Sequence, residues 1–133
     1  MDVSREGGCQ CGSVRYRLEA EPLGLAICHC RDCQRQSGSA FAMSLDVPRQ
    51  SFRLLSGELK TFLATCDSAR TKECAFCSAC GTRIYHQGEW GMSIKAGTLD
   101  DTSSFSPDAH YWTKRKQGWL QIPEDVRCFT DDG

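Results

Sequence analysis

The sequence predicts a mainly β fold built from antiparallel strands, with only a few short helical turns. Short stretches in which apolar and polar residues alternate are separated by turns that contain glycine. No stretch keeps a helical period of apolar residues over a dozen positions. The length of 133 residues fits one domain that spans residues 1–133.

The clearest strand lies at residues 13–21, where Val14, Tyr16 and Leu18 alternate with polar neighbours. A short apolar run at residues 23–28 leads from there into a group of cysteines. Residues 32–37 are expected to form one turn of helix before Gly38. The cysteine group is therefore predicted to lie on a strand end and a turn.

Further strands are expected at residues 40–47, 51–55, 59–64, 71–76, 82–87 and 92–96. Ser56 and Gly57 are a turn signal, so the strands at 51–55 and 59–64 are predicted to pair as a hairpin. Ser106 followed by Pro107 predicts a helical turn at residues 107–112.

Composition argues against several classes of partner. The formal net charge is -1 and the only dense basic run is Lys114-Arg115-Lys116, so no nucleic-acid partner is expected. No segment has the roughly 18 apolar residues that a membrane span needs, and the first residues lack the apolar core of a signal peptide. We therefore expect a cytoplasmic protein without a membrane partner. Its ten cysteines should be metal ligands rather than disulfides, because cytosolic thiols are kept reduced.

Four cysteines form two pairs in which a glycine follows the second member. These are Cys9 and Cys11, before Gly12, and Cys77 and Cys80, before Gly81. Glycine allows a turn with positive φ, which brings backbone N–H groups toward the sulfurs. We expect these four thiolates to hold one closed, structural zinc ion, a type of site worth on the order of 10 kcal/mol of apparent folding free energy in small peptides.

Three further cysteines, Cys28, Cys30 and Cys33, lie within six residues and have no local fourth partner. A zinc ion with three protein ligands keeps a position for water or substrate, so this site is predicted to be open. A closed site would instead take its fourth ligand from a histidine or from Cys66, Cys74 or Cys128. Three thiolates leave a bound Zn²⁺ with a net charge of about -1, which suits it to holding a substrate sulfur for attack on a small electrophile. Two zinc ions per chain are expected, with iron the alternative metal at thiolate sites.

Polar residues beside the three cysteines are further candidates. Arg31 and Arg35 would offset the negative charge, and Arg35 is the preferred ligand for a carboxylate of the thiol substrate. Ser37, with Gly38 and Ser39, would donate hydrogen bonds to a developing alkoxide. A surface or turn role is the alternative for each of these residues.

For the histidines and for Cys74, a structural role is the preferred interpretation. Strand alternation is expected to turn His29 away from the metal, with an acid or base role as the alternative. His86 is expected to be a strand residue, and His110 a candidate to line a pocket near Trp112. Cys74 lies in an alternating strand, so core packing is favoured over a metal site with Cys77.

The order of the cysteine motifs along the chain, CxCG, CHCxxC and CxxCG, resembles that of the glutathione-dependent formaldehyde-activating enzyme family. The domain of this family is also found in centromere protein V. The segments that carry the resemblance are GGCQCGSVRY at 7–16, CHCRDCQRQSGSAF at 28–41, FCSACGTRIY at 76–85, AGTLDD at 96–101 and the late Trp119. The resemblance implies a β-tent of antiparallel sheets, a structural zinc on the four paired cysteines and a second zinc on the other three.

The same resemblance implies an enzyme of the carbon-sulfur lyase type, similar to S-(hydroxymethyl)glutathione synthase. Its partners would be glutathione or a similar thiol and formaldehyde or another small aldehyde. The alternatives are a carrier that binds the thiol without turnover and a zinc-stabilised interaction module.

Overall fold

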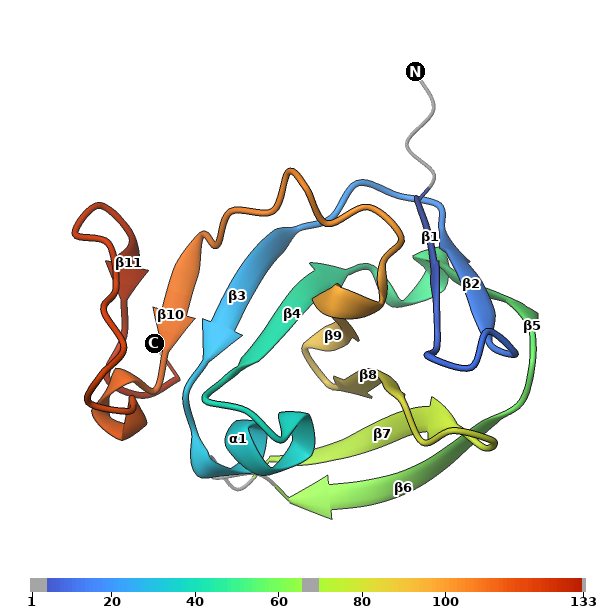
Figure 1. The fold of residues 1–133 in the computed structure, drawn as a ribbon, viewed down its shortest axis with the longest axis horizontal. Coiled ribbons are helices and arrows are strands. Elements are labelled where there is room, and N and C mark those ends of the chain that lie inside the picture. The colour runs from blue at the N-terminus through green and yellow to red at the C-terminus, as the bar shows by residue number, and fades with distance from the viewer. Residues whose placement is uncertain (1–4, 66–69, 133) are drawn as a thin grey trace.

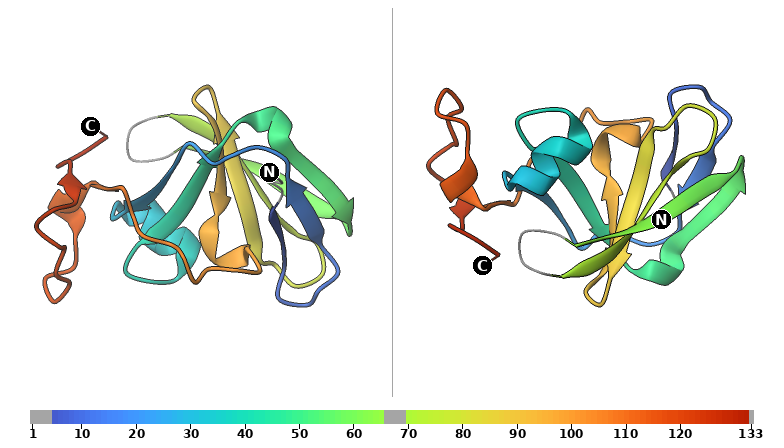
Figure 2. Two further views of the ribbon diagram at one scale, coloured as in Figure 1. Left: turned by 90° about the horizontal axis from the view of Figure 1, so that it is seen from above. Right: turned by 90° about the horizontal axis from the view of Figure 1, so that it is seen from below.

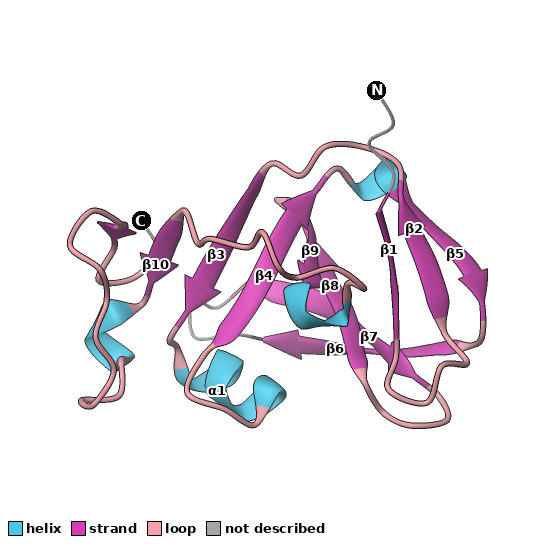
Figure 3. Ribbon diagram, turned by 45° about the horizontal axis from the view of Figure 1, so that its top comes forward, coloured by secondary structure: helices cyan, strands magenta, loops and turns pink. Residues whose placement is uncertain are grey.

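The computed structural model describes residues 5–65 and 70–132, and strands are the main regular secondary structure in this part of the chain (Figure 1). The predicted fold class is confirmed, because the fold is mainly β. Within these residues the single α-helix is α1 (Arg31–Ser37), and three short 3-10 turns accompany it (Figure 3). The 3-10 turns are Arg49–Ser51, Ala96–Thr98 and Thr113–Arg115. None of these helical segments is long and apolar enough to cross a membrane.

A small antiparallel sheet contains three strands in the order β1-β2-β5. Its strands are β1 (Arg5–Gly8), β2 (Arg15–Leu18) and β5 (Phe52–Ser56). The strand predicted at residues 13–21 supplies β2, and its apolar side is buried as the alternation indicated. Strand β1 was not predicted from the sequence, because it is short and ends in two glycines.

The large sheet contains eight strands in the order β11-β10-β3-β4-β9-β8-β7-β6. They are β3 (Gly24–Cys28), β4 (Ala42–Val47), β6 (Leu59–Thr65), β7 (Thr71–Cys77), β8 (Arg83–Gly88), β9 (Gly91–Lys95), β10 (Ala109–Tyr111) and β11 (Arg127–Cys128). The neighbours are antiparallel except at β10, which runs parallel to β3 and to β11.

The main core lies between the small sheet and one face of the large sheet, which stand beside each other in Figure 2. Tyr16 and Leu18 from β2 pack there with Ile94 from β9, and all three side chains are fully buried. The other face of the large sheet carries α1, which packs against β4. Strand alternation therefore separates an apolar face of the sheet from a face that is free to carry polar residues.

The hairpin predicted for residues 51–55 and 59–64 was wrong. Both strands exist, but β5 pairs with β2 while β6 pairs with β7. Between them Gly57 adopts a positive φ of 86°, and a Cβ atom there would lie 2.4 Å from the carbonyl oxygen of Ser13. The chain therefore turns at Gly57 from the small sheet into the large sheet. Strands β5 and β6 do not pair, because each pairs with a different strand.

The helical turn predicted at residues 107–112 was also wrong, because β10 occupies this segment. The Asp108 backbone N–H donates to the Leu25 carbonyl oxygen, and the Leu25 N–H donates to the Asp108 carboxylate at 2.7 Å. These bonds align β10 with the edge of β3. The Ser-Pro signal is local, and pairing with a distant strand overrides it.

Candidate functional site

The four paired cysteines converge at the junction of the two sheets. The sulfurs of Cys9, Cys11, Cys77 and Cys80 all lie within 4.8 Å of one another. The separation is 3.5 Å between Cys9 and Cys11 and 3.9 Å between Cys11 and Cys77. Sulfurs bound to one tetrahedral zinc ion lie about 3.8 Å apart, since the zinc–sulfur distance is about 2.3 Å. The donor set therefore fits zinc.

Glycine turns and backbone N–H groups shape this four-sulfur cluster. Gly12 and Gly81 adopt φ values of 85° and 82°, as the sequence predicted. The Val14 N–H donates to the Cys9 sulfur at 3.2 Å, and the Ala79 N–H donates to the Cys77 sulfur at 3.3 Å. Such bonds disperse negative charge on thiolates. The cluster links the turn after β1 in the small sheet to the end of β7 in the large one.

The other three cysteines form a second cluster where β3 meets α1. Cys28 ends β3, Cys30 caps the N-terminus of α1, and Cys33 lies in its first turn. Their sulfurs lie within 4.8 Å of one another. The Cys33 N–H donates to the Cys30 sulfur at 3.3 Å, so the helix cap itself positions two of the three sulfurs.

In the described part of the chain, no fourth histidine, cysteine or carboxylate joins this three-sulfur cluster. Cys74 is fully buried in β7 and Cys128 is exposed on β11, and neither belongs to the cluster. Cys66, the third alternative, lies outside the described residues. Three soft sulfur donors within this spacing fit a zinc ion that keeps one position for another ligand.

The three thiols share negative charge unevenly. Hydrogen bonds from the thiols of Cys28 and Cys33 lower the pKa of Cys30 to about 2. The neighbouring Cys30 sulfur in turn raises the pKa of Cys28. Negative charge in this cluster therefore lies first on Cys30, and thiolate is the form in which cysteine binds a metal.

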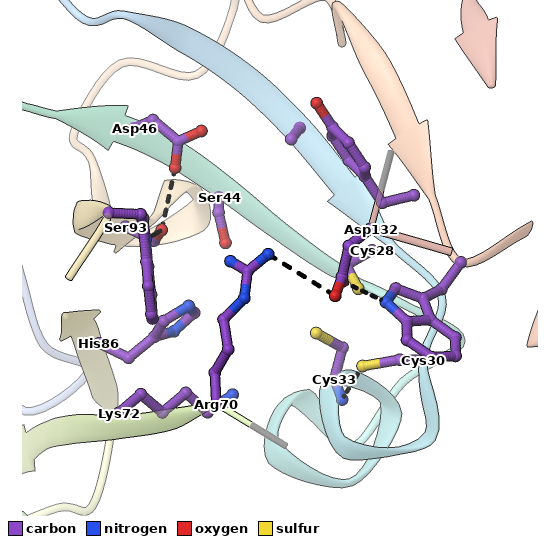
Figure 4. A pocket seen from close by; sticks show the side chains of 14 residues that line it. Cys28, Cys30, Cys33, Ser44, Asp46, Arg70, Lys72, His86, Ser93 and Asp132 are labelled. Atoms are coloured by element: carbon purple, nitrogen blue, oxygen red, sulfur yellow. Dashed lines mark hydrogen bonds and ion pairs between the residues drawn. The ribbon is translucent and has the colours of Figure 1, made fainter. Parts of the chain in front are cut away.

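A cavity of about 280 Å³ opens beside the three-sulfur cluster (Figure 4). Its lining comes from six strands of the large sheet (β3, β4, β7, β8, β9 and β10), from α1 and from the loops beside them. The lining residues are Ala26, Cys28, Cys30, Cys33, Ser44, Asp46, Arg70, Lys72, His86, Trp90, Ser93, Tyr111, Trp112 and Asp132. Figure 4 shows the cysteines at one end, and Asp46, Ser93 and His86 at the other. A cavity of this size can hold a small organic molecule.

Two buried lysines offset the negative charge of the sulfurs. Lys72 on β7 forms an ion pair with Asp32 of α1; burial alone would lower the pKa of Lys72, but this pair raises it. Burial lowers the pKa of Lys95 to about 8, and the Nζ atom of Lys95 has no hydrogen-bond partner. Both ammonium groups interact electrostatically with Cys33. The site therefore has positive charge close to its thiolates.

The histidines divide between the core and the cavity. His29 is fully buried and turns away from the sulfurs, as strand alternation predicted; its Nε2 lies 2.9 Å from Nδ1 of His110. His110 is therefore part of this buried pair and does not line the cavity. His86 does line it from β8, and burial lowers its pKa to about 2, so the ring is neutral.

The other polar candidates lie on the outer side of α1. Arg31, Arg35 and Ser39 line a separate hollow with the exposed Trp119, away from the lining of the sulfur cavity. The Ser37 hydroxyl donates to the Phe41 carbonyl oxygen at 2.9 Å and accepts a bond from the Ser39 N–H. These contacts place Ser37 in the turn that ends the helix. The substrate roles of Arg35 and Ser37 stay predictions.

Sequence reasoning missed the cavity wall formed by Asp46, Lys72, His86 and Ser93. These residues come from four strands, and the register places Asp46 opposite Ser93 and Ser93 opposite His86. A partial signal existed, because polar residues alternate with apolar ones along β4 and β9. Finding the wall also required the strand order, which the sequence alone does not give.

Comparisons with known proteins show which family the chain belongs to. Residues 4–115 match the family model described as "Glutathione-dependent formaldehyde-activating enzyme". A Halomonas elongata protein named "Putative glutathione-dependent formaldehyde-activating enzyme" is 26% identical over 134 aligned positions, covering 93% of this chain and 85% of its own. A crystal structure of a Rhodobacter sphaeroides protein has a similar fold, with a TM-score of 0.57 and 21% identity, over 74% of this chain and 91% of its own.

Proposed function

The chain belongs to the glutathione-dependent formaldehyde-activating enzyme family, and from this premise we propose that it is a zinc-dependent enzyme of the carbon-sulfur lyase type. Its substrates are glutathione or a similar thiol and formaldehyde or another small aldehyde. The reaction makes the S-hydroxymethyl adduct of the thiol, or runs in the reverse direction. We place this activity in the cytoplasm, where such a thiol is abundant and cysteines stay reduced.

One observation carries the proposal: three sulfurs within 4.8 Å of one another line a cavity of about 280 Å³. In the described residues these sulfurs have no fourth protein ligand. A zinc ion held by Cys28, Cys30 and Cys33 would stabilise a substrate sulfur as a thiolate. The cavity gives that sulfur a route to the cluster.

The chain's own residues would bind and orient the reactants. The thiol releases its proton to solvent and its sulfur attacks the carbonyl carbon. A carbon-sulfur bond forms, and the π electron pair of the C=O bond moves to oxygen, which takes one proton back from solvent. Lys72 and Lys95 would offset the charge of four thiolates around one metal. Ser44 lines the cavity between the sulfurs and Asp46 (Figure 4), and its hydroxyl would donate a hydrogen bond to the aldehyde oxygen.

The four-sulfur cluster has a different role in this proposal. Cys9, Cys11, Cys77 and Cys80 would hold a structural zinc ion that has no vacant position for substrate. The short sulfur separations and the bonds from backbone N–H groups support this role. The protein would then contain two zinc ions with separate tasks.

Exchange NMR spectroscopy of glutathione and formaldehyde tests the activity. Zinc-loaded protein in catalytic amounts should speed up the interconversion of the free thiol and its adduct. Cys33→Ser should abolish the acceleration, because it removes a ligand of the open cluster, whereas Cys128→Ser should keep it. Cys128 is a suitable control because its exposed sulfur belongs to neither cluster.

Two outcomes would contradict the enzyme proposal. A shift in the adduct equilibrium that depends on stoichiometric protein, without acceleration, would identify a thiol carrier. No effect of the protein on either the rate or the equilibrium would leave a zinc-stabilised interaction module.

A further inference from the structure

The end of the cavity farthest from the cysteines presents a fixed carboxylate. Asp46 on β4 accepts a hydrogen bond from the Ser93 hydroxyl at 2.9 Å, and Ser93 accepts one from the Trp90 indole N–H at 3.2 Å. These two hydrogen bonds hold the Asp46 side chain in place, so that its carboxylate lines the cavity (Figure 4). Its Oδ1 atom accepts the Ser93 bond, while no bond is formed by Oδ2 within the described residues.

Asp46 forms no ion pair with any described residue, although Arg70 and Lys72 line the same cavity. Among the described residues, the ion pairs join other carboxylates, and the guanidinium of Arg70 pairs with Asp132 at 3.6 Å. Burial raises the pKa of Asp46, and the Ser93 bond offsets this only in part. A half-buried carboxylate without a counter-ion is costly, and a cationic ligand would remove this cost.

Two neighbours complete an environment suited to an ammonium group. His86 is 8% exposed, and its Nδ1 atom has no hydrogen-bond partner. The Trp90 ring lies 5.8 Å from the His86 ring in an edge arrangement, and both rings line the cavity. An ammonium group has three donors and is attracted to aromatic faces. The Arg70 guanidinium already lies over the Trp90 ring, 5.9 Å from its centroid, so this indole attracts a cation within the chain. A carboxylate without an ion pair, a neutral imidazole and an indole therefore surround the place where an ammonium group would bind.

Strand register sets the distance between this acidic end and the sulfurs. Cys28 on β3 is opposite Ala42 on β4, and Asp46 lies four residues farther along β4. At about 3.3 Å per residue, the two ends of the cavity are on the order of 13 Å apart. Contacts at each end take up roughly 3 Å of this distance. A thiol that spans the cavity should therefore carry its amine roughly 7–10 Å from its sulfur.

We propose that Asp46, with His86 and Trp90, binds the α-ammonium group of a γ-glutamyl thiol whose sulfur lies at the three-cysteine cluster. The γ-glutamyl linkage places that amine roughly 9 Å from the sulfur when extended, whereas the amine of cysteine is only about 3 Å away. This inference rests on the proposed function and narrows its substrate class to γ-glutamyl thiols with a free amine. The terminal glycine of glutathione is not required for this contact.

Thiol titrations of the full chain test the proposal, with cobalt in the three-cysteine cluster as the optical probe. Glutathione and γ-glutamylcysteine should bind with similar affinity. N-acetylglutathione and cysteinylglycine, which lack the amine at that distance, should bind at least about tenfold more weakly. Asp46→Asn should weaken glutathione binding by a similar factor and change the affinity for N-acetylglutathione less than about twofold, because that ligand has no charge for Asp46 to recognise.

The wild-type series decides the question even if Asp46→Asn does not fold. Equal affinities for glutathione and N-acetylglutathione would overturn the ammonium site while leaving thiol binding, and with it the proposed function, intact. A cobalt spectrum that responds to none of the four thiols would overturn both. Weaker binding of the two ligands without the amine, with glutathione still bound, would support the site.

Discussion

The two cysteine clusters use the same ligand atoms in opposite surroundings. In the four-sulfur cluster, Cys11 and Cys80 are exposed to solvent. None of its four cysteines lines any of the cavities described in the structure. In the three-sulfur cluster, Cys30 and Cys33 are buried, yet all three members line a cavity. The cluster with two exposed sulfurs and no cavity is therefore the one suited to architecture, and the cluster that lines a cavity is the one suited to chemistry.

The comparison teaches that the number of ligands and the shape around them matter more than exposure. Four sulfurs leave a tetrahedral metal no vacant position, however exposed they are. Three sulfurs leave one, and burial then strengthens the electrostatic effect of nearby charges such as Lys72 and Lys95. Breaking each cluster separately should therefore have different consequences.

Removing a ligand from the four-sulfur cluster should have the largest effect. Cys77 is buried in the main core and ties β7 to the turn after β1. We expect Cys77→Ser to lower the free energy of unfolding by about 5 kcal/mol or more, enough to unfold a typical domain at 25 °C. Urea unfolding followed by circular dichroism measures this loss. Cys128→Ser is the matched control and should change stability by less than about 0.5 kcal/mol; a folded, stable Cys77→Ser protein would show that this cluster is not architectural.

Removing a ligand from the three-sulfur cluster should cost one metal ion but not the fold. We expect Cys33→Ser to keep the circular dichroism spectrum and to lose about 1–2 kcal/mol of stability, because Cys33 packs only in a small satellite cluster beside α1. Metal analysis should find one zinc ion fewer per chain than in the wild type. Unfolding as complete as that expected for Cys77→Ser would remove the distinction between the two clusters.

Substitution of Lys72 should weaken metal binding at the three-sulfur cluster and leave the four-sulfur cluster unchanged. Its side chain is 4% exposed, and its ion pair with Asp32 fastens α1 to β7. We expect Lys72→Met to weaken metal binding at this cluster by about tenfold or more and to lower stability by about 1–3 kcal/mol. Competition with a chelator measures the affinity. Lys60→Met, an exposed position on the adjacent strand β6, is the control; identical metal affinities for the two variants would argue against this role.

Arg35→Ala should have the smallest effect, because Arg35 is exposed on the outer side of α1 and does not line the sulfur cavity. We expect the affinity for glutathione to change by less than about twofold. A tenfold loss in the same titration would instead support the role that the sequence predicted, as a ligand for the carboxylate of the thiol.

Cysteine spacing and strand alternation were enough to predict much of this molecule. The glycines after Cys11 and Cys80 indicated turns of positive φ, and both are present. The pattern of β2 predicted which of its side chains are buried. These features are local, since a few adjacent residues determine them.

Features that depend on distant pairing were missed or wrong. The partner of β6 is β7 rather than β5, and β10 forms against β3 in place of a helical turn. The acidic end of the cavity was missed for the same reason, because Asp46 and His86 meet only through the order β4-β9-β8. Strand order is set by packing over the whole sheet, and short sequence patterns do not encode it.

The most direct test of the difference between the clusters is to count the sulfur ligands of cobalt in the three-cysteine cluster, by X-ray absorption, before and after glutathione is added. The four-sulfur cluster stays loaded with zinc. We expect three sulfurs without glutathione and four with it, and the same result for Cys66→Ser, which tests the remaining protein thiol. Four sulfurs already present before glutathione, unchanged by it and reduced to three in Cys66→Ser, would show that both clusters are closed.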